Sequence, residues 1–221
     1  MTQMPESYII LTKLLRILCF QGLSVMNLSR PLLIVVSAPS GAGKSTLCNK
    51  LLAETKDLVY SISCTTRKPR GQEQDGVAYH FLTDDEFVSR VENGDFLEHA
   101  IVHGNRYGTL RSSVEQALSN GKSIIMDIDV AGAAQVREII KGLPDANLIK
   151  GAFVDIFITV PSIAELEARF NKRGEDTPEV IQKRLNNAKG EIARSNEYKY
   201  VVVNDDLERA YLELCKILSE A

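Results

Sequence analysis

Four apolar runs along the chain predict the strands of a buried sheet. The runs are largely continuous rather than alternating and rich in β-branched residues, which is typical of strands covered on both faces. They are Leu32 to Val36, Ser123 to Ile128, Phe153 to Val160 and Tyr200 to Val203. Segments with helical spacing, such as Lys44 to Thr55 and Leu207 to Leu218, lie between and after them. Alternating strands and helices predict an α/β fold with a parallel sheet and right-handed crossovers.

Polar residues indicate where several helices begin. Thr83, Ser112 and Ser162 each stand three positions before a glutamate, a spacing that predicts capping boxes. Thr177 precedes Pro178, which suits an N-cap followed by the first helical residue.

Two stretches do not fit the predicted sheet. Residues 63–103 hold short alternating segments between glycines, which indicates a small mixed insertion. Residues 162–196 are helical, polar and rich in Arg and Lys, which favours a mobile lid over a core layer. The domain would then span 30–221, after an N-terminal extension over 1–29. Its core would comprise residues 30–62, 104–161 and 197–221.

The N-terminal extension holds a mostly apolar run from Tyr8 to Phe20 that Lys13 and Arg16 interrupt. This run is too short to cross a bilayer and lacks the layout of a signal peptide. Met26 offers a second start just before the first predicted strand. We expect a dispensable extension and no association with a membrane.

Composition narrows the classes of protein further. The 221 residues are 44% apolar and 25% charged, as expected for one globular domain. A net charge of −3 argues against a protein that coats nucleic acid, and aromatics at 6% without Trp argue against a stacking platform for single strands.

The cysteines and histidines predict no metal site. The cysteines, Cys19, Cys48, Cys64 and Cys215, are widely spaced, which favours free thiols in a reducing compartment and a cytoplasmic location. His99 and His103 have a spacing that could place them on one helical face, but they lack the H-E-x-x-H pattern of zinc enzymes.

A glycine-rich segment directly follows the first predicted strand and precedes the first predicted helix. It consists of Ala38, Pro39, Ser40, Gly41, Ala42, Gly43, Lys44 and Ser45. The segment matches the phosphate-binding pattern G-x-x-x-x-G-K-[ST], except that Ala38 replaces the first glycine. In such a loop the backbone N–H groups and the helix N-terminus surround phosphate oxygens, Lys44 adds positive charge, and the Ser45 hydroxyl binds Mg²⁺. The alternative is a glycine-rich turn without a ligand.

Asp127 ends the second apolar run, where an acid can hold Mg²⁺ through water. Asp129 lies on the same face if the strand continues. The alternative for a single strand-end aspartate is a helix cap or a solvated residue.

Two further groups of cations suit phosphate. Residues 61–70 combine hydroxyls with Arg67, Lys68 and Arg70, and Arg169 and Arg173 recur four positions apart ahead of Arg184. Arginine forks bind phosphate oxygens in pairs. The alternatives are a solvated basic loop and an ordinary charged helix face.

Together these motifs resemble the guanylate kinase family, in particular its short bacterial type, over residues 30–220. The resemblance rests on the phosphate-binding loop and on S-x-T-T-R-x-P-R, Y-H-F at 79–81, F-L-E at 96–98, N-R-Y-G-T at 105–109, D-I-D-V-x-G at 127–132, R-x-x-x-R-G at 169–174 and V-N-D-D at 203–206. It implies a three-layer P-loop core with a monophosphate-binding insertion and a lid. It also implies Mg²⁺-dependent transfer of the γ-phosphoryl group of ATP to GMP or dGMP.

The resemblance also implies roles for individual residues. ATP would contact Ala38, Pro39, Ser40, Gly41, Ala42, Gly43, Lys44, Ser45, Thr46 and, near the adenine, Asn204. The GMP phosphate would be bound by Ser63, Arg67, Arg70 and Tyr79, and the rest of GMP by Glu98, Tyr107, Thr109 and Asp129. The catalytic cations would be Lys44, Arg169, Arg173 and Arg184, with Mg²⁺ held by Ser45 and, through water, by Asp127.

Two alternatives to this enzyme stay open from the sequence. One is an inactive binding module on the same fold, although the intact Gly43-Lys44-Ser45 argues against it. The other is a kinase of another phosphorylated acceptor, such as a ribose phosphate, which would not need the guanine-reading Glu98, Thr109 and Asp129. The oligomeric state, monomer or homodimer, is also open.

Overall fold

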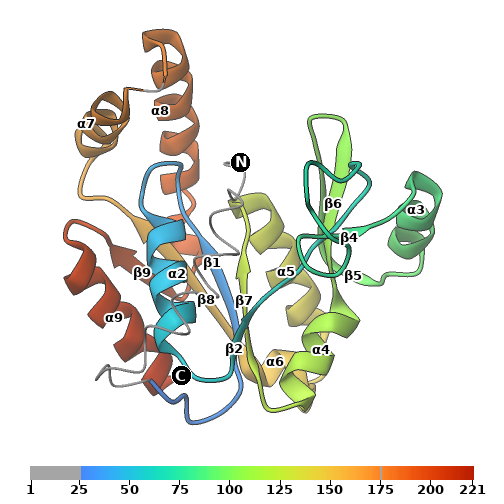
Figure 1. Ribbon diagram of the computed structural model, residues 1–221. Helices are drawn as coiled ribbons and strands as arrows, with labels where there is room; N and C mark the ends of the chain where they lie inside the picture. The colour runs from blue at the N-terminus through green and yellow to red at the C-terminus, as the bar shows by residue number, and fades with distance from the viewer. Residues whose placement is uncertain (1–25, 175) are drawn as a thin grey trace.

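A five-stranded parallel sheet forms the centre of the computed structural model, which describes residues 26–174 and 176–221 (Figure 1). The strand order is β2-β7-β1-β8-β9. The bounds are Leu33–Ser37 for β1, Leu58–Tyr60 for β2, Ser123–Asp127 for β7, Phe153–Thr159 for β8 and Tyr200–Val203 for β9. The predicted parallel α/β fold is confirmed. The four predicted strands are present, and β2 is an additional short edge strand.

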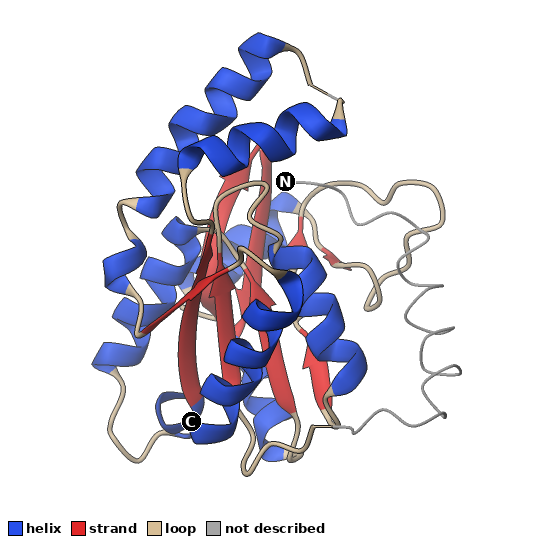
Figure 2. Cartoon of the chain, turned by 90° about the vertical axis from the view of Figure 1, so that its left-hand side faces the viewer, coloured by secondary structure: helices blue, strands red, loops and turns tan. Residues whose placement is uncertain are grey.

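Helices cover both faces of this sheet (Figure 2). One face carries α2 (Lys44–Glu54) and α9 (Leu207–Glu220), and the other carries α4 (Arg111–Ser119), α5 (Val130–Gly142) and α6 (Leu148–Ala152). Successive side chains of a strand point to opposite faces. Ile34 and Val36 of β1 therefore pack with α2 and α9, while Leu33 and Val35 pack with α4 and α5. Both layers are buried, as the continuous apolar runs predict.

A second, four-stranded sheet lies beside the core, on the right in Figure 1, in the order β4-β3-β6-β5. Its strands are β3 (Cys64–Thr65), β4 (His80–Phe81), β5 (Phe96–Val102) and β6 (Asn105–Leu110), and α3 (Asp84–Glu92) packs on it. The Phe87 and Phe96 rings stack with centroids 4.5 Å apart. The predicted insertion over 63–103 ends before β6, which pairs with both β3 and β5.

Helices α7 (Ile163–Arg173) and α8 (Pro178–Ile192) project beyond the sheet on the opposite side from the second sheet (Figure 1). Leu166 and Phe170 of α7 share a buried cluster with Ile181 and Leu185 of α8. The 3-10 helix η1 (Ser195–Glu197) then leads into β9. We call this pair the α7–α8 hairpin. It lies within the predicted lid, residues 162–196, and that prediction concerns how the hairpin moves.

The predicted helix caps have mixed outcomes. Thr83 forms a complete capping box with Glu86, and the Ser162 hydroxyl accepts the Glu165 N–H. Thr177 is the N-cap of α8 with proline next, but its hydroxyl makes no capping bond. The prediction for Ser112 is wrong, because α4 begins after Leu110 and Ser112 lies inside the helix.

The predictions for residues 1–25, including the apolar run and Cys19, lie outside the described residues. Met26 N donates a hydrogen bond to the Glu54 carbonyl at 2.8 Å. Within 26–174 and 176–221, no helix has the length and apolar character needed to cross a membrane. The shared helical face considered for His99 and His103 does not form, since His99 lies in β5 and His103 in the following turn.

Candidate functional site

The glycine-rich loop joins β1 to α2, as predicted. Gly41 and Gly43 have φ values of 84° and 90°, which glycine adopts without steric cost. A Cβ on Gly43 would lie 2.2 Å from Asn204 Nδ2, and one on Gly41 would lie 2.8 Å from the Phe170 ring. Among the described residues, the only non-glycine residues with a positive φ are Asp57 and His103. Ala38 in place of the first glycine therefore introduces no left-handed strain.

Lys44, the first residue of α2, contacts Asp127 at the end of β7. Lys44 Nζ forms an ion pair with the Asp127 carboxylate and donates to the Ile128 carbonyl at 3.3 Å. Both side chains are mostly buried, with 19% and 17% exposed. Ser45 stands exposed in the first turn of α2. The carboxylate and the hydroxyl are hard oxygen ligands of the kind that Mg²⁺ prefers.

Glu98, Thr109 and Asp129 come together at the junction of the second sheet with the core. Glu98 is 7% exposed, and its Oε1 accepts a hydrogen bond from Thr109 Oγ1 at 2.8 Å. A Cβ on Gly132 would lie 3.3 Å from Glu98 Oε2 and 3.5 Å from Asp129 Oδ1. Burial raises the pKa of Glu98 to about 7; the Thr109 hydroxyl opposes the rise and Asp129 adds to it.

Asp129 does not continue strand β7, which ends at Asp127. It is the N-cap of α5, and its Oδ1 accepts the Gly132 N–H at 2.8 Å. The helix-cap alternative is therefore realised, and the same carboxyl group lies beside Glu98. An N-cap also leaves carboxylate oxygen lone pairs for a further donor.

The cationic loop of the second sheet is held by an acid that our sequence analysis missed. Glu73 binds Arg67 Nη2 at 2.9 Å and accepts the Arg70 N–H at 2.8 Å. Its carboxylate raises the pKa of the Arg67 guanidinium. Arg67 also stands over the Tyr79 ring at 5.2 Å, and the Tyr107 ring lies 5.9 Å from Tyr79. The structure thus brings Arg67, Tyr79 and Tyr107 together.

Ser63 and Arg70 complete the predicted phosphate side. Ser63 immediately precedes β3, and its carbonyl accepts the His80 N–H at 2.9 Å. The Arg70 side chain is exposed. Glu73 follows Arg70 by three positions. This spacing is the signal in the sequence that could have identified Glu73 as the acid that holds the cationic loop.

The predicted lid arginines occupy different surroundings. Arg169 binds Glu165 at 2.9 Å and the Asn204 carbonyl at 2.8 Å, so it reaches the phosphate-binding loop through Asn204. Asn204 itself is buried and donates to the Ala42 carbonyl at 2.7 Å. Arg184 pairs with Asp176 at 3.3 Å, and Arg173 is exposed at the end of α7. Only Arg169 is thus joined to the loop in this state.

Glu191, in the last turn of α8, is a second acid that our sequence analysis missed. Its half-buried carboxylate faces the Ser40 N–H and the Lys44 ammonium group at the loop. Burial raises its pKa, and both of those groups oppose the rise. Nothing in the helical spacing of α8 distinguishes Glu191 from a solvent-facing acid. The C-terminal end of the α7–α8 hairpin therefore lies beside the phosphate-binding loop.

Comparison with known proteins identifies relatives across this whole region. The family model described as guanylate kinase matches residues 30–221. The chain is 48% identical over 190 residues to the guanylate kinase of Clostridium perfringens strain 13, covering 86% of this chain and 83% of that protein. It is 46% identical to that of Fusobacterium nucleatum, covering 84% and 95%.

A solved structure agrees with the sequence relatives. The crystal structure of guanylate kinase from Anaplasma phagocytophilum is similar with a TM-score of 0.60 and 35% identity, covering 86% of this chain and 85% of that one. The family match spans both the five-stranded core and the two parts that flank it. The chain belongs to the guanylate kinase family.

Proposed function

We propose that the protein transfers the γ-phosphoryl group of ATP to GMP or dGMP, giving ADP and the nucleoside diphosphate. The observation that carries the choice of acceptor is the buried Glu98–Thr109 hydrogen bond with Asp129 beside it. A carboxylate removed from water needs donors. The phosphate-binding loop at the end of β1 would bind the phosphates of the nucleoside triphosphate, ATP.

The chemistry of guanine matches this cluster. Guanine offers its N1–H and N2–H donors side by side, and a carboxylate such as Glu98 accepts both. The O6 acceptor requires a donor, which the Thr109 hydroxyl would supply by turning its single proton from Glu98 Oε1 to O6. Adenine has no such pair of donors and would leave the buried carboxylate unsatisfied, which lowers kcat/KM by about 10⁴-fold. A sugar phosphate acceptor would leave the whole cluster without a partner.

The phosphate ends of the two nucleotides would meet between the cationic groups. Lys44 would bind the outer phosphates of ATP, while Ser63, Arg67, Arg70 and Tyr79 would bind the phosphate of GMP. The attacking atom is an ionised phosphate oxygen, so no strong general base is needed. Catalysis then consists of alignment and neutralisation of charge, to which Arg169, Arg173 and Arg184 would contribute from the lid.

Magnesium fits the oxygens beside Lys44. Ser45 would bind the ion directly and Asp127 through water, and the ion would neutralise charge on the phosphates of ATP. In the structure Asp127 is paired with Lys44. The ammonium group would exchange part of this pairing for a phosphate of ATP. The free thiols of Cys48, Cys64 and Cys215 fit action in the reducing cytoplasm.

A coupled ADP-release assay with Mg²⁺-ATP and, in turn, GMP, dGMP, AMP, CMP, UMP and dTMP tests the proposal. We expect turnover with the guanine nucleotides and, with the others, a kcat/KM lower by about 10⁴-fold. Equal rates with AMP would contradict the role of Glu98. Binding of GMP without turnover would instead favour the inactive module.

A further inference from the structure

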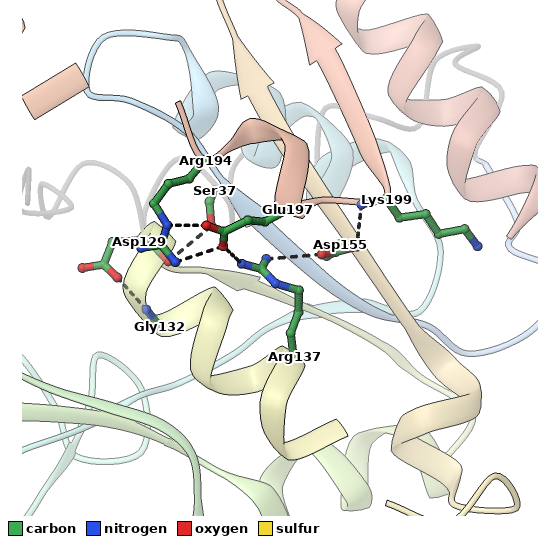
Figure 3. Close-up of polar contacts among 8 residues, drawn as sticks. All are labelled: Ser37, Asp129, Gly132, Arg137, Asp155, Arg194, Glu197 and Lys199. Carbon is green, nitrogen blue, oxygen red and sulfur yellow. Dashed lines mark hydrogen bonds and ion pairs between the residues drawn. The ribbon is translucent and has the colours of Figure 1, made fainter. Parts of the chain in front are cut away.

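Glu197 lies between Arg137 of α5 and Arg194 of the turn that follows α8, in a cluster that the proposed reaction does not use (Figure 3). Its Oε2 accepts from Arg137 Nη2 at 2.6 Å, while Arg194 donates from Nε to Oε1 at 2.7 Å and from Nη2 to Oε2 at 2.9 Å. Both carboxylate oxygens are thus occupied by charge-assisted hydrogen bonds. Paired bonds of this kind fix geometry as well as charge.

The Glu197 side chain is 37% exposed, but the cluster is tied to the core through Arg137, which is 18% exposed. Arg137 also binds the Asp155 carboxylate at 3.3 Å, and the Asp155 side chain is only 5% exposed. Asp155 Oδ1 accepts the Lys199 N–H at 3.1 Å. The Arg137 guanidinium lies 4.4 Å from the centre of the buried Tyr198 ring. Two arginines therefore balance two carboxylates, and the flat guanidinium of Arg137 is fixed from two sides.

The two arginines connect this cluster to the candidate site. Arg194 comes directly after Ala193, the C-cap of α8, so it marks the base of the α7–α8 hairpin. Arg137 belongs to α5, whose N-cap is Asp129. The Asp129 carbonyl in turn accepts a hydrogen bond from Ser37 Oγ, at the end of β1, at 3.4 Å. One carboxylate thus joins the base of the hairpin to the helix that begins beside Glu98.

We propose that Glu197 is a positioning residue that fixes the C-terminal end of α8 against α5. The inference rests on the proposed function, in which Arg184 of α8 and the N-cap of α5 contact the two nucleotides. With its base held by Glu197, the hairpin can move at its free end while the base keeps its place beside the phosphate-binding loop. Glu197 itself contacts neither nucleotide. Its effect passes through Arg194 to α8.

Steady-state kinetics on the full-length protein tests this role with Glu197→Gln, Arg194→Gln and the double variant. We expect kcat in Glu197→Gln to fall about tenfold to a hundredfold, the range that misplacement of catalytic groups produces. The KM for GMP should change far less, since Glu98 and Thr109 are untouched. The double variant should be no slower than Glu197→Gln, because both changes break one link. Asp145→Asn removes the exposed ion pair with Lys150 and serves as the control with unchanged kcat.

Hydrogen exchange without nucleotides gives a readout that does not depend on activity. We expect the amides in the last turn of α8 to exchange faster in Glu197→Gln than in the wild type or in Asp145→Asn. A kcat within twofold of wild type, effects of the two single variants that multiply, or unchanged exchange would each overturn the inference. If the wild type phosphorylates no guanine nucleotide, the proposed function fails, and the positioning role in catalysis fails with it. The exchange experiment still decides whether Glu197 anchors α8.

Discussion

At the scale of single residues, Glu98 combines burial with a role that requires charge. Its pKa is raised from 4.5 to about 7 by burial. Between these values the folded, ligand-free protein holds a proton on Glu98 that the unfolded chain has released. The contribution of Glu98 to stability is therefore fully present below pH 4.5 and is lost as the pH rises through 7.

Glu98→Gln removes this titration while keeping an oxygen that accepts from Thr109. Relative to wild type, the variant should gain about 3 kcal/mol in free energy of unfolding between pH 4.5 and pH 8, the equivalent of the shift in pKa. Urea unfolding at a series of pH values, without nucleotides, measures the difference. Glu92→Gln, an exposed position on α3, is the matched control. A difference that does not vary with pH would contradict a buried, titrating Glu98.

The contacts of Lys44 in the structure differ from its proposed role. It is held by Asp127 and the Ile128 carbonyl, whereas the proposed reaction would place it at a phosphate. Lys44→Ala should lower kcat by about 10²-fold to 10³-fold or more, since one preorganised charge at the reacting phosphate is lost. The Kd of GMP should change little, because Glu98, Thr109 and Asp129, the residues proposed to bind guanine, are intact. Lys50→Ala, which removes an ion pair of the same helix with Glu54, is the control.

At the scale of elements, the caps show what a local pattern can and cannot predict. The spacing of Thr83 and Ser112 from glutamate is the same, yet only Thr83 caps a helix. At the start of α4, the N–H of its first residue, Arg111, donates to the carbonyl of Asp95, which directly precedes β5, at 2.8 Å. This long-range hydrogen bond holds the chain at Arg111, and α4 starts before Ser112. The S-x-x-E pattern alone does not contain that information.

These caps provide a paired test. Thr83→Ala should lower the free energy of unfolding by about 1 kcal/mol, because the Glu86 N–H loses its acceptor and Glu86 Oε2 loses the hydrogen bond from Thr83 Oγ1. Ser112→Ala should change it by less than about 0.5 kcal/mol, since Ser112 is exposed inside α4. Urea unfolding of the two variants against wild type measures both. Equal losses would mean that the capping bond of Thr83 carries no stability.

The strands follow the same division between local and long-range information. The long apolar runs predicted β1, β7, β8 and β9, because strands buried on both faces leave a continuous signal. Strand β2 is only Leu58–Tyr60 and depends on pairing with β7, in which Leu58 lies opposite Ser123. Strands β3 and β4 have two residues each. Elements this short are defined by their partners rather than by their own pattern.

At the scale of the whole molecule, the sequence predicted several of the residues that meet but not how the cations are paired. Glu98 of β5, Thr109 of β6 and Asp129 at the start of α5 come together, and their role in binding guanine stays a prediction. The acids that hold the cations were missed. Glu197 binds Arg137 across 60 positions, and such a contact leaves no periodic signal. Conversely, Arg67 and Arg184 are paired with acids of their own segments, Glu73 and Asp176.

This pairing suggests how the molecule responds to its two substrates. The α7–α8 hairpin and the second sheet stand on opposite sides of the phosphate-binding loop (Figure 1). The phosphates of ATP and GMP would together compete with Asp176 and Glu73 for Arg184 and Arg67, and so draw both parts toward the loop. Either nucleotide alone would supply only part of that charge.

We therefore expect a non-hydrolysable ATP analogue and GMP together to protect residues 162–196 from trypsin more than the product of their separate effects. Trypsin cleaves after Lys and Arg, in which this segment is rich, and mass spectrometry of the fragments over time measures each site. Cleavage within α9, which packs beside α2 and is not part of the hairpin, is the internal control. Lys44→Ala, which weakens the ATP side alone, should reduce the combined protection. Equal cleavage of 162–196 with one nucleotide and with both would show that the hairpin does not close on the pair of substrates.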